Sequence, residues 1–86
     1  MTQELEYLHP EDYFYTFDLG LACALVTLEY RLHAMHRGNA SKAEFVFKRN
    51  KSIDGDVKRY WDKKLPADLR TYFDNLKMLK SRLYSD

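Results

Sequence analysis

The stretch that decides the fold is residues 18–30, DLGLACALVTLEY, which holds the longest apolar run of the chain. A helix drawn over this stretch is apolar around most of its circumference, and such a helix is buried on several sides. Small residues at 22–24 allow a sheet to approach closely. Thr16 or Asp18 offers a side-chain oxygen to the free N–H groups of the helix start, and Asp18 also complements the helix dipole. The stretch therefore predicts a central, buried helix.

The segments on either side of this helix favour β-strands. Residues 13–17, YFYTF, are mostly aromatic, which is typical of a short strand. Residues 31–37 and 43–49 flank the connection GNAS at 38–41, which contains turn-forming residues. We therefore expect a strand, the helix and then a β-hairpin.

Alternation along the hairpin assigns its side chains to two faces. Phe45 and Phe47 are expected to face the core, and Leu32, Ala34 and His36 are expected to share one face of the first strand. The opposite, solvent face is expected to consist of Arg31, His33, Met35, Arg37, Lys42, Glu44, Val46 and Lys48.

Two helices are predicted after the hairpin. The first spans about residues 54–64 and is expected to bury the aromatic pair Tyr60 and Trp61. Pro66 suits the first turn of the second helix, which is expected to run to about Tyr84 with apolar residues at helical spacing.

The resulting order is β-α-β-β-α-α. Three strands cannot enclose a core alone, so we expect an α+β fold with a small three-stranded sheet and all helices packed on one face. We expect residues 1–12 to form an acidic N-terminal arm and residues 13–86 to form a single domain.

Composition excludes several classes of protein. The 86 residues contain a single cysteine, Cys23, so an intramolecular disulfide framework is impossible. The N-terminus carries no basic segment followed by an apolar one, and the apolar run of residues 19–28 is too short to span a bilayer. We therefore expect a cytoplasmic protein without a membrane partner.

The net charge of +1 conceals a strong asymmetry. Residues 1–30 contain six acids and no Lys or Arg, whereas residues 31–86 contain all 14 Lys and Arg against seven acids. Such a split can mark a surface that binds polyanions, or the two halves can neutralise each other in the fold.

No candidate for catalysis, metal binding or cofactor binding emerges from the sequence. His33 and His36 are three residues apart, so on a strand they point to opposite faces and cannot chelate together. The segment from Asn50 resembles a calcium loop but has Trp61 where a bidentate Glu is required. Cys23 lies in the apolar helix, where thiols are usually inert. We expect a protein that is not an enzyme.

The basic hairpin is the strongest functional candidate. Cations on a twisted ribbon can follow nucleic-acid phosphates, and the six cations expected to do so are Arg31, Arg37, Lys42, Lys48, Arg49 and Lys51. Alternatively, these residues keep an open sheet soluble. The competing function is a protein-interaction module or homodimer that uses apolar helix surface.

Four separated blocks carry a resemblance to a known family: YTFDLGLA at 15–22, FVF at 45–47, YW at 60–61 and FDNLKMLKSRLY at 73–84. Together they resemble a family of short prokaryotic and mobile-element proteins classed as a domain of unknown function. The resemblance covers about residues 13–84. It implies the same β-α-β-β-α-α order and no particular activity.

A weaker resemblance is to RNA-recognition-motif domains, which stack bases on aromatic side chains of two central strands. Residues 14–19 and 42–47 are loosely similar to the two aromatic motifs of those strands. The fourth strand of that fold is missing, because residues 66–84 are expected to be helical, and so are the glycines of the longer motif.

Overall fold

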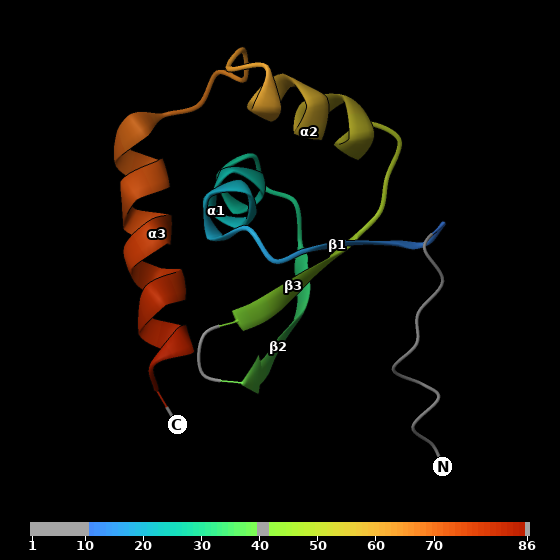
Figure 1. The fold of residues 1–86 in the computed structure, drawn as a ribbon. Coiled ribbons are helices and arrows are strands. Elements are labelled where there is room, and N and C mark those ends of the chain that lie inside the picture. The colour runs from blue at the N-terminus through green and yellow to red at the C-terminus, as the bar shows by residue number, and fades with distance from the viewer. Residues whose placement is uncertain (1–10, 40–41, 86) are drawn as a thin grey trace.

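The computed structural model describes residues 11–39 and 42–85, and Figure 1 shows their arrangement. The chain runs through β1 (Tyr13–Thr16), α1 (Leu19–Thr27), β2 (Leu32–Asn39), β3 (Lys42–Lys48), α2 (Ile53–Trp61) and α3 (Leu69–Leu83). The predicted α+β class and its β-α-β-β-α-α order are confirmed. Residues 1–10 of the predicted arm and residues 40–41 of the predicted turn lie outside the described residues.

The sheet has three antiparallel strands in the order β1-β3-β2. Strand β3 lies in the middle, where it pairs with β1 from Tyr13↔Lys48 to Thr16↔Phe45. On its other side it pairs with β2, with Leu32 opposite Phe47 and Met35 opposite Phe45. The central position of β3 explains why its segment 45–47 is the most deeply buried part of the sheet.

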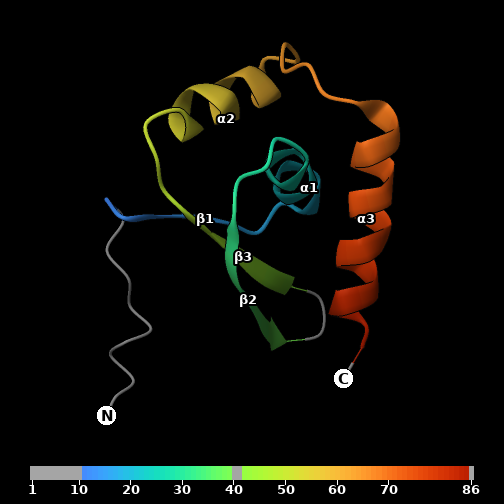
Figure 2. The same ribbon diagram turned by 180° about the vertical axis from the view of Figure 1, so that it is seen from behind.

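Helix α1 occupies the centre of the fold, with the sheet on one side and α2 and α3 around it (Figures 1 and 2). The core unites side chains from all these elements, namely Leu21, Ala22, Cys23, Leu25, Phe45, Phe47, Ile53 and Leu79. The prediction that Phe45 and Phe47 turn inward is therefore confirmed. Because these rings belong to the core, the weak likeness to RNA-recognition motifs carries no argument about base stacking on them.

Helix α1 begins where its capping residue predicts. Asp18 Oδ1 accepts a hydrogen bond from the Leu21 N–H at 2.8 Å, and Thr16 Oγ1 accepts one from the Asp18 N–H at 3.0 Å. These bonds satisfy donors that the first turn of a helix leaves free. Both residues considered for the cap thus contribute, with Asp18 as the cap itself.

The helix ends earlier than the apolar pattern predicts, at Thr27 rather than at residue 30. Glu29 adopts a φ of 73°, and the Glu29 and Tyr30 N–H groups donate back to the carbonyls of Val26 and Leu25. This left-handed termination usually contains glycine. Glu29 thus ends the helix, although the sequence pattern predicts a helix that continues to residue 30.

The end of α2 is similar to the end of α1, and the start of α3 has a side-chain cap. Helix α2 stops at Trp61, because Lys63 turns with a φ of 64° and the Lys64 N–H donates to the Arg59 carbonyl. Helix α3 is capped by Asp68, whose carboxylate accepts from the Thr71 N–H at 2.8 Å. Pro66 therefore lies before the cap and not within the first turn.

The expected faces of β2 are wrong from Ala34 to Arg37, because the strand contains an irregularity. Ala34 and His36 lie on the outer face of the sheet, opposite the helices, so His33 and His36 share a face instead of pointing to opposite sides. The register shifts between Leu32 and Ala34, so that Leu32 and Met35 both face the core side of the sheet. A bulge of one extra residue reverses the alternation that follows it. Arg37 consequently lies on the helix side and not on the expected solvent face.

Trp61 also departs from its expected position, since 57% of its surface is exposed. Its neighbour Tyr60 is half-buried and packs against the core, with the two rings edge to face at 5.0 Å between centroids. Adjacent residues on a helix point about 100° apart, so only one of the pair can face α1. Tyr60 takes that position.

Gly20 in the first turn of α1 lies where two tyrosines meet the helix backbone. A Cβ atom at this position would be 2.5 Å from Tyr60 Oη and 3.4 Å from Tyr72 Oη. Tyr72 Oη also lies 3.4 Å from the Gly20 carbonyl oxygen, to which it donates. The lack of a side chain at Gly20 thus allows α2 and α3 to approach the start of α1.

We predict that Gly20→Ala destabilises the fold by about 1–3 kcal/mol, because overpacking outweighs the gain of about 1 kcal/mol in helix propensity. In a Tyr60→Phe background the closest oxygen is gone, and the same substitution should cost at least about 1 kcal/mol less. Urea unfolding of the four proteins in this double-mutant cycle measures the coupling. An identical effect of Gly20→Ala in both backgrounds would show that Tyr60 does not restrict this site.

Candidate functional site

The outer face of the sheet, opposite the three helices, carries a group of polar and aromatic side chains. Register places Tyr13 and Tyr15 of β1 on this face, across from Lys48 and Val46 of β3. The alternating Phe14 and Thr16 face the helices instead. In residues 11–39 and 42–85 no helix lies over the outer face (Figures 1 and 2).

An aromatic pair crosses this face at the Lys48 end of β3. The rings of Tyr13 and His33 have centroids 4.8 Å apart and are tilted by 48°. Because β1 and β2 are separated by β3, the two side chains meet above the central strand. Tyr13 is half-buried by this arrangement, whereas His33 remains exposed.

Val46 lies on the same face and was expected to contact solvent, yet none of its surface is exposed. Its partners across the sheet are Tyr15 and Ala34. Side chains of both flanking strands thus close over the middle of β3. The outer face is therefore a packed surface with an apolar base, which gives its polar groups fixed positions.

The remaining groups of the outer face belong to the two long strands. His36 Nδ1 lies 3.8 Å from Glu44 Oε1, and both residues are paired across β2 and β3. At the start of β3, Lys42 Nζ lies 5.1 Å from the centroid of the exposed Phe17 ring. Lys48, at the other end of β3, is exposed opposite Tyr13.

The structure divides the six predicted phosphate-binding cations into two groups. Arg37 and Arg49 lie on the helix side, where both are engaged. Arg37 Nη1 donates to the carbonyls of Leu83 and Ser85 at 2.8 and 2.6 Å, next to the end of α3. Arg49 Nη1 contacts both carboxylate oxygens of Asp54, at 2.7 and 2.8 Å.

The second group consists of exposed cations, namely Arg31, Lys42, Lys48 and Lys51. Within the described residues, none of the four forms an ion pair with an acid. The sequence analysis identified these cations, but it did not predict that Tyr13 lies beside Lys48. The alternation of Tyr with Phe and Thr along residues 13–16 is the signal that separates its outer from its inner side chains.

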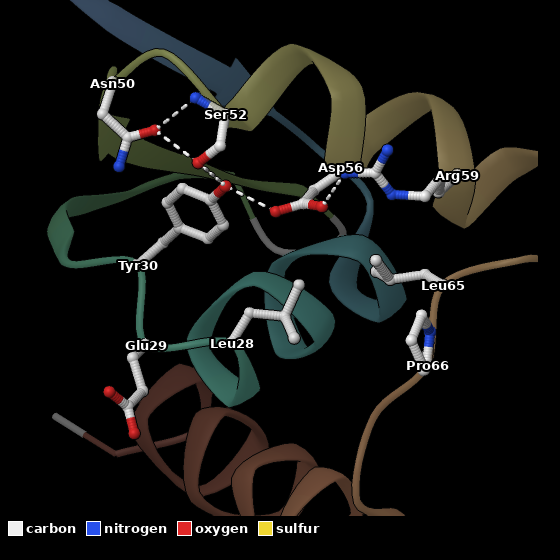
Figure 3. Close-up of a pocket in the computed structure, with 9 residues that line it drawn as sticks. All are labelled: Leu28, Glu29, Tyr30, Asn50, Ser52, Asp56, Arg59, Leu65 and Pro66. Carbon is white, nitrogen blue, oxygen red and sulfur yellow. Dashed lines mark hydrogen bonds and ion pairs between the residues drawn. The ribbon is translucent and has the colours of Figure 1, made fainter.

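A shallow cleft of about 390 Å³ is the second candidate site. Figure 3 shows its polar wall, where Tyr30 from the segment after α1 reaches Ser52 and Asp56 of the α2 region. Tyr30 Oη donates to Asp56 Oδ2 at 2.6 Å and lies 2.7 Å from Ser52 Oγ. Arg59 donates to the other oxygen of Asp56 at 2.5 Å. Leu28, Leu65 and Pro66 form an apolar wall.

This hydrogen-bond network fixes α2 to the end of α1. The hydrogen bonds from Tyr30 and then Arg59 lower the pKa of Asp56, while burial and the bond to Asp56 raise the pKa of Tyr30. Asp56 is therefore anionic and Tyr30 protonated at neutral pH. Both carboxylate oxygens already have partners, so the network acts as a structural clasp and leaves no free general base.

The thiol of Cys23 is buried in the core. Burial, with a smaller contribution from the Asp18 charge, raises the pKa of Cys23 to about 11. At neutral pH the thiol is protonated, and a protonated thiol is a weak nucleophile. Its place within the core cluster agrees with a packing role.

No three His, Cys, Asp or Glu side chains in the described part of the chain come close enough together to hold a metal ion. None of the helices in residues 11–39 and 42–85 has the length and apolar character needed to cross a membrane.

The fold and its outer face define a small α+β domain in which a three-stranded sheet covers one side of a buried helix. The chain belongs to the family described as a domain of unknown function (DUF5659), which matches residues 11–85. No curated protein and no solved structure matches the chain.

We predict that Asp56→Asn lowers the free energy of unfolding by about 1–2 kcal/mol at pH 7, because it replaces a charged acceptor of two hydrogen bonds. Since the folded-state pKa of Asp56 is lowered, its stabilisation exists above the unfolded pKa of about 3.9 and disappears as the pH falls through the folded value. The difference between wild type and variant should therefore shrink as the pH falls below about 3.9 in urea titrations.

Asp74→Asn is the matched control, because Asp74 is exposed on α3 and has one ion pair, with Arg70 at 3.7 Å. It should change stability by less than about 0.5 kcal/mol at either pH. Equal losses in the two variants, or a loss at Asp56 that does not depend on pH, would contradict the assignment of the clasp.

Proposed function

We propose that this protein binds nucleic acid through the outer face of its sheet. The observation that carries the proposal is that Lys48 lies beside the Tyr13–His33 pair and Lys42 at the other end of β3, on a face that no described helix covers. Lys side chains without acidic partners can neutralise phosphates and release counterions. Membership of the family is compatible with the proposal and adds no information about activity.

The balance of charge on this face supports an anionic ligand. Glu44 is its only acid among the described residues of the hairpin, and it already lies beside His36. Arg31 and Lys51, at the outer ends of the hairpin, add two exposed cations. Arg37 and Arg49 are withdrawn from the original set of six, because the positions of their guanidinium groups are fixed on the helix side.

We predict that affinity for a labelled 20-nucleotide DNA falls steeply with salt. The double variant Lys42→Glu/Lys48→Glu should bind about tenfold more weakly at 50 mM NaCl, with a salt slope that is smaller by about 2. Fluorescence anisotropy at five salt concentrations measures both quantities. The expected loss follows from removing two phosphate contacts.

The control is Lys64→Glu/Lys77→Glu, which changes the net charge equally but alters exposed residues of the α2–α3 region. It should retain most of the affinity. Nucleic-acid binding is refuted if wild-type protein fails to bind at 50 mM NaCl, and the assigned face is refuted if both double variants lose affinity alike.

Exposed apolar side chains support a second candidate function, the binding of another protein or of a second copy of the chain. Trp61 ends α2 with 57% of its surface exposed, and Leu69 and Phe73 of α3 are 82% and 51% exposed. Leu69 and Phe73 are four residues apart and therefore share one side of the helix. Large exposed rings of this kind are frequent at the centres of interfaces.

For a homodimer, light scattering coupled to gel filtration should give twice the mass of 10.3 kDa at micromolar concentration. Phe73→Ser should then restore the monomer, since it removes an apolar contact without affecting the buried side of α3. A monomeric wild type at all concentrations up to about 1 mM, which corresponds to a binding free energy smaller than about 4 kcal/mol, would exclude self-association.

A further inference from the structure

We infer that the ligand of the outer face is a single-stranded nucleic acid, one of whose bases stacks against the Tyr13–His33 pair. This inference rests on the proposed function and deepens it by naming the form of nucleic acid and the residues that select it. The ring pair crosses the central strand β3 near its Lys48 end, with 4.8 Å between the ring centroids.

The aromatic pair is suited to an unpaired base. His33 is exposed although its ring lies against Tyr13, so the contact fixes the orientation of the imidazole and leaves part of it accessible. Bases stack readily on such rings in proteins that bind single strands without sequence preference. In a duplex the base faces are already stacked on one another and are not available to a protein surface.

The width of the sheet also argues against a duplex. Three strands spaced by about 4.8 Å place the axes of β1 and β2 about 10 Å apart, before any side chain is added. The major groove is about 12 Å wide and admits a two-stranded ribbon. With β1 beside the hairpin and Tyr13 projecting from it, the face is too broad to enter a groove.

The cations lie where a strand stacked on the pair needs them. Lys48 is the direct cross-strand partner of Tyr13, so its amine is within reach of the phosphate of a nucleotide stacked there. Lys42 lies six residues away along β3, which corresponds to about 20 Å. A strand following β3 therefore meets a cation at each end and the aromatic pair near one of them.

The test compares fluorescein-labelled dT15 with a 15-base-pair duplex at 50 mM NaCl by fluorescence anisotropy. Wild-type protein should bind dT15 at least tenfold more tightly than the duplex. Tyr13→Leu, which keeps apolar bulk but loses the ring, should weaken dT15 binding about 5- to 100-fold and affect duplex binding little. Tyr13→Phe, which keeps the ring, should bind dT15 like the wild type.

Two further variants complete the design. Tyr84→Leu removes an exposed tyrosine next to the end of α3, away from the outer face, and should leave the affinity unchanged. His33→Phe should retain or strengthen dT15 binding, because it preserves a ring at this position. Circular dichroism melting of each variant establishes that it is folded under the binding conditions.

The possible failures are distinguishable. Equal affinity for dT15 and duplex, or wild-type affinity of Tyr13→Leu for dT15, overturns the single-strand inference. The proposed function still stands in that case if the binding depends on salt. Absence of binding to either DNA at 50 mM NaCl overturns both. Tight dT15 binding that Tyr13→Leu weakens and that Tyr13→Phe and His33→Phe retain establishes the stacking site.

Discussion

The contact between α1 and the phenylalanines of β3 supports the rest of the structure. A domain of 86 residues buries only about 60% of the surface of its unfolded chain, so few side chains can contribute to its core. Phe45 and Phe47 are the largest of the fully buried ones, and they meet the helix in a shared core cluster. The cap at Asp18 and the open position at Gly20 fix where this helix starts and how closely its neighbours approach.

The bulge in β2 sets which side chains of this strand join the core and which lie on the outer face. By reversing the alternation after Leu32, it turns Met35 toward the core beside Phe45. The residue between Leu32 and Ala34, His33, then meets Tyr13 across the central strand. An irregular edge strand is also a poor template for pairing with other chains, so the same feature protects the longer of the two sheet edges.

The sequence allowed prediction of features that depend on local pattern. The order of elements, the cap at Asp18 and the inward position of Phe45 and Phe47 all follow from composition and alternation within a few residues. The early end of α1 could not be predicted, because Glu29 occupies a left-handed position where glycine is usual. The clasp joins Tyr30 to Asp56, 26 residues apart, and contacts at such separation leave no periodic signal.

The basic hairpin shows most clearly what a sequence pattern leaves open. Six cations within 21 residues appear equivalent in the sequence, yet the fold separates them. A guanidinium group carries several donors, and the two arginines of the helix side each contact two acceptor oxygens through Nη1, Arg37 on two carbonyls and Arg49 on one carboxylate. Lysine amines on flexible stems remain on the outer face, where a ligand with mobile phosphates requires charge and little geometry. The charge that a surface can offer to a ligand is therefore set by the cations that are not bonded to acceptors within the fold.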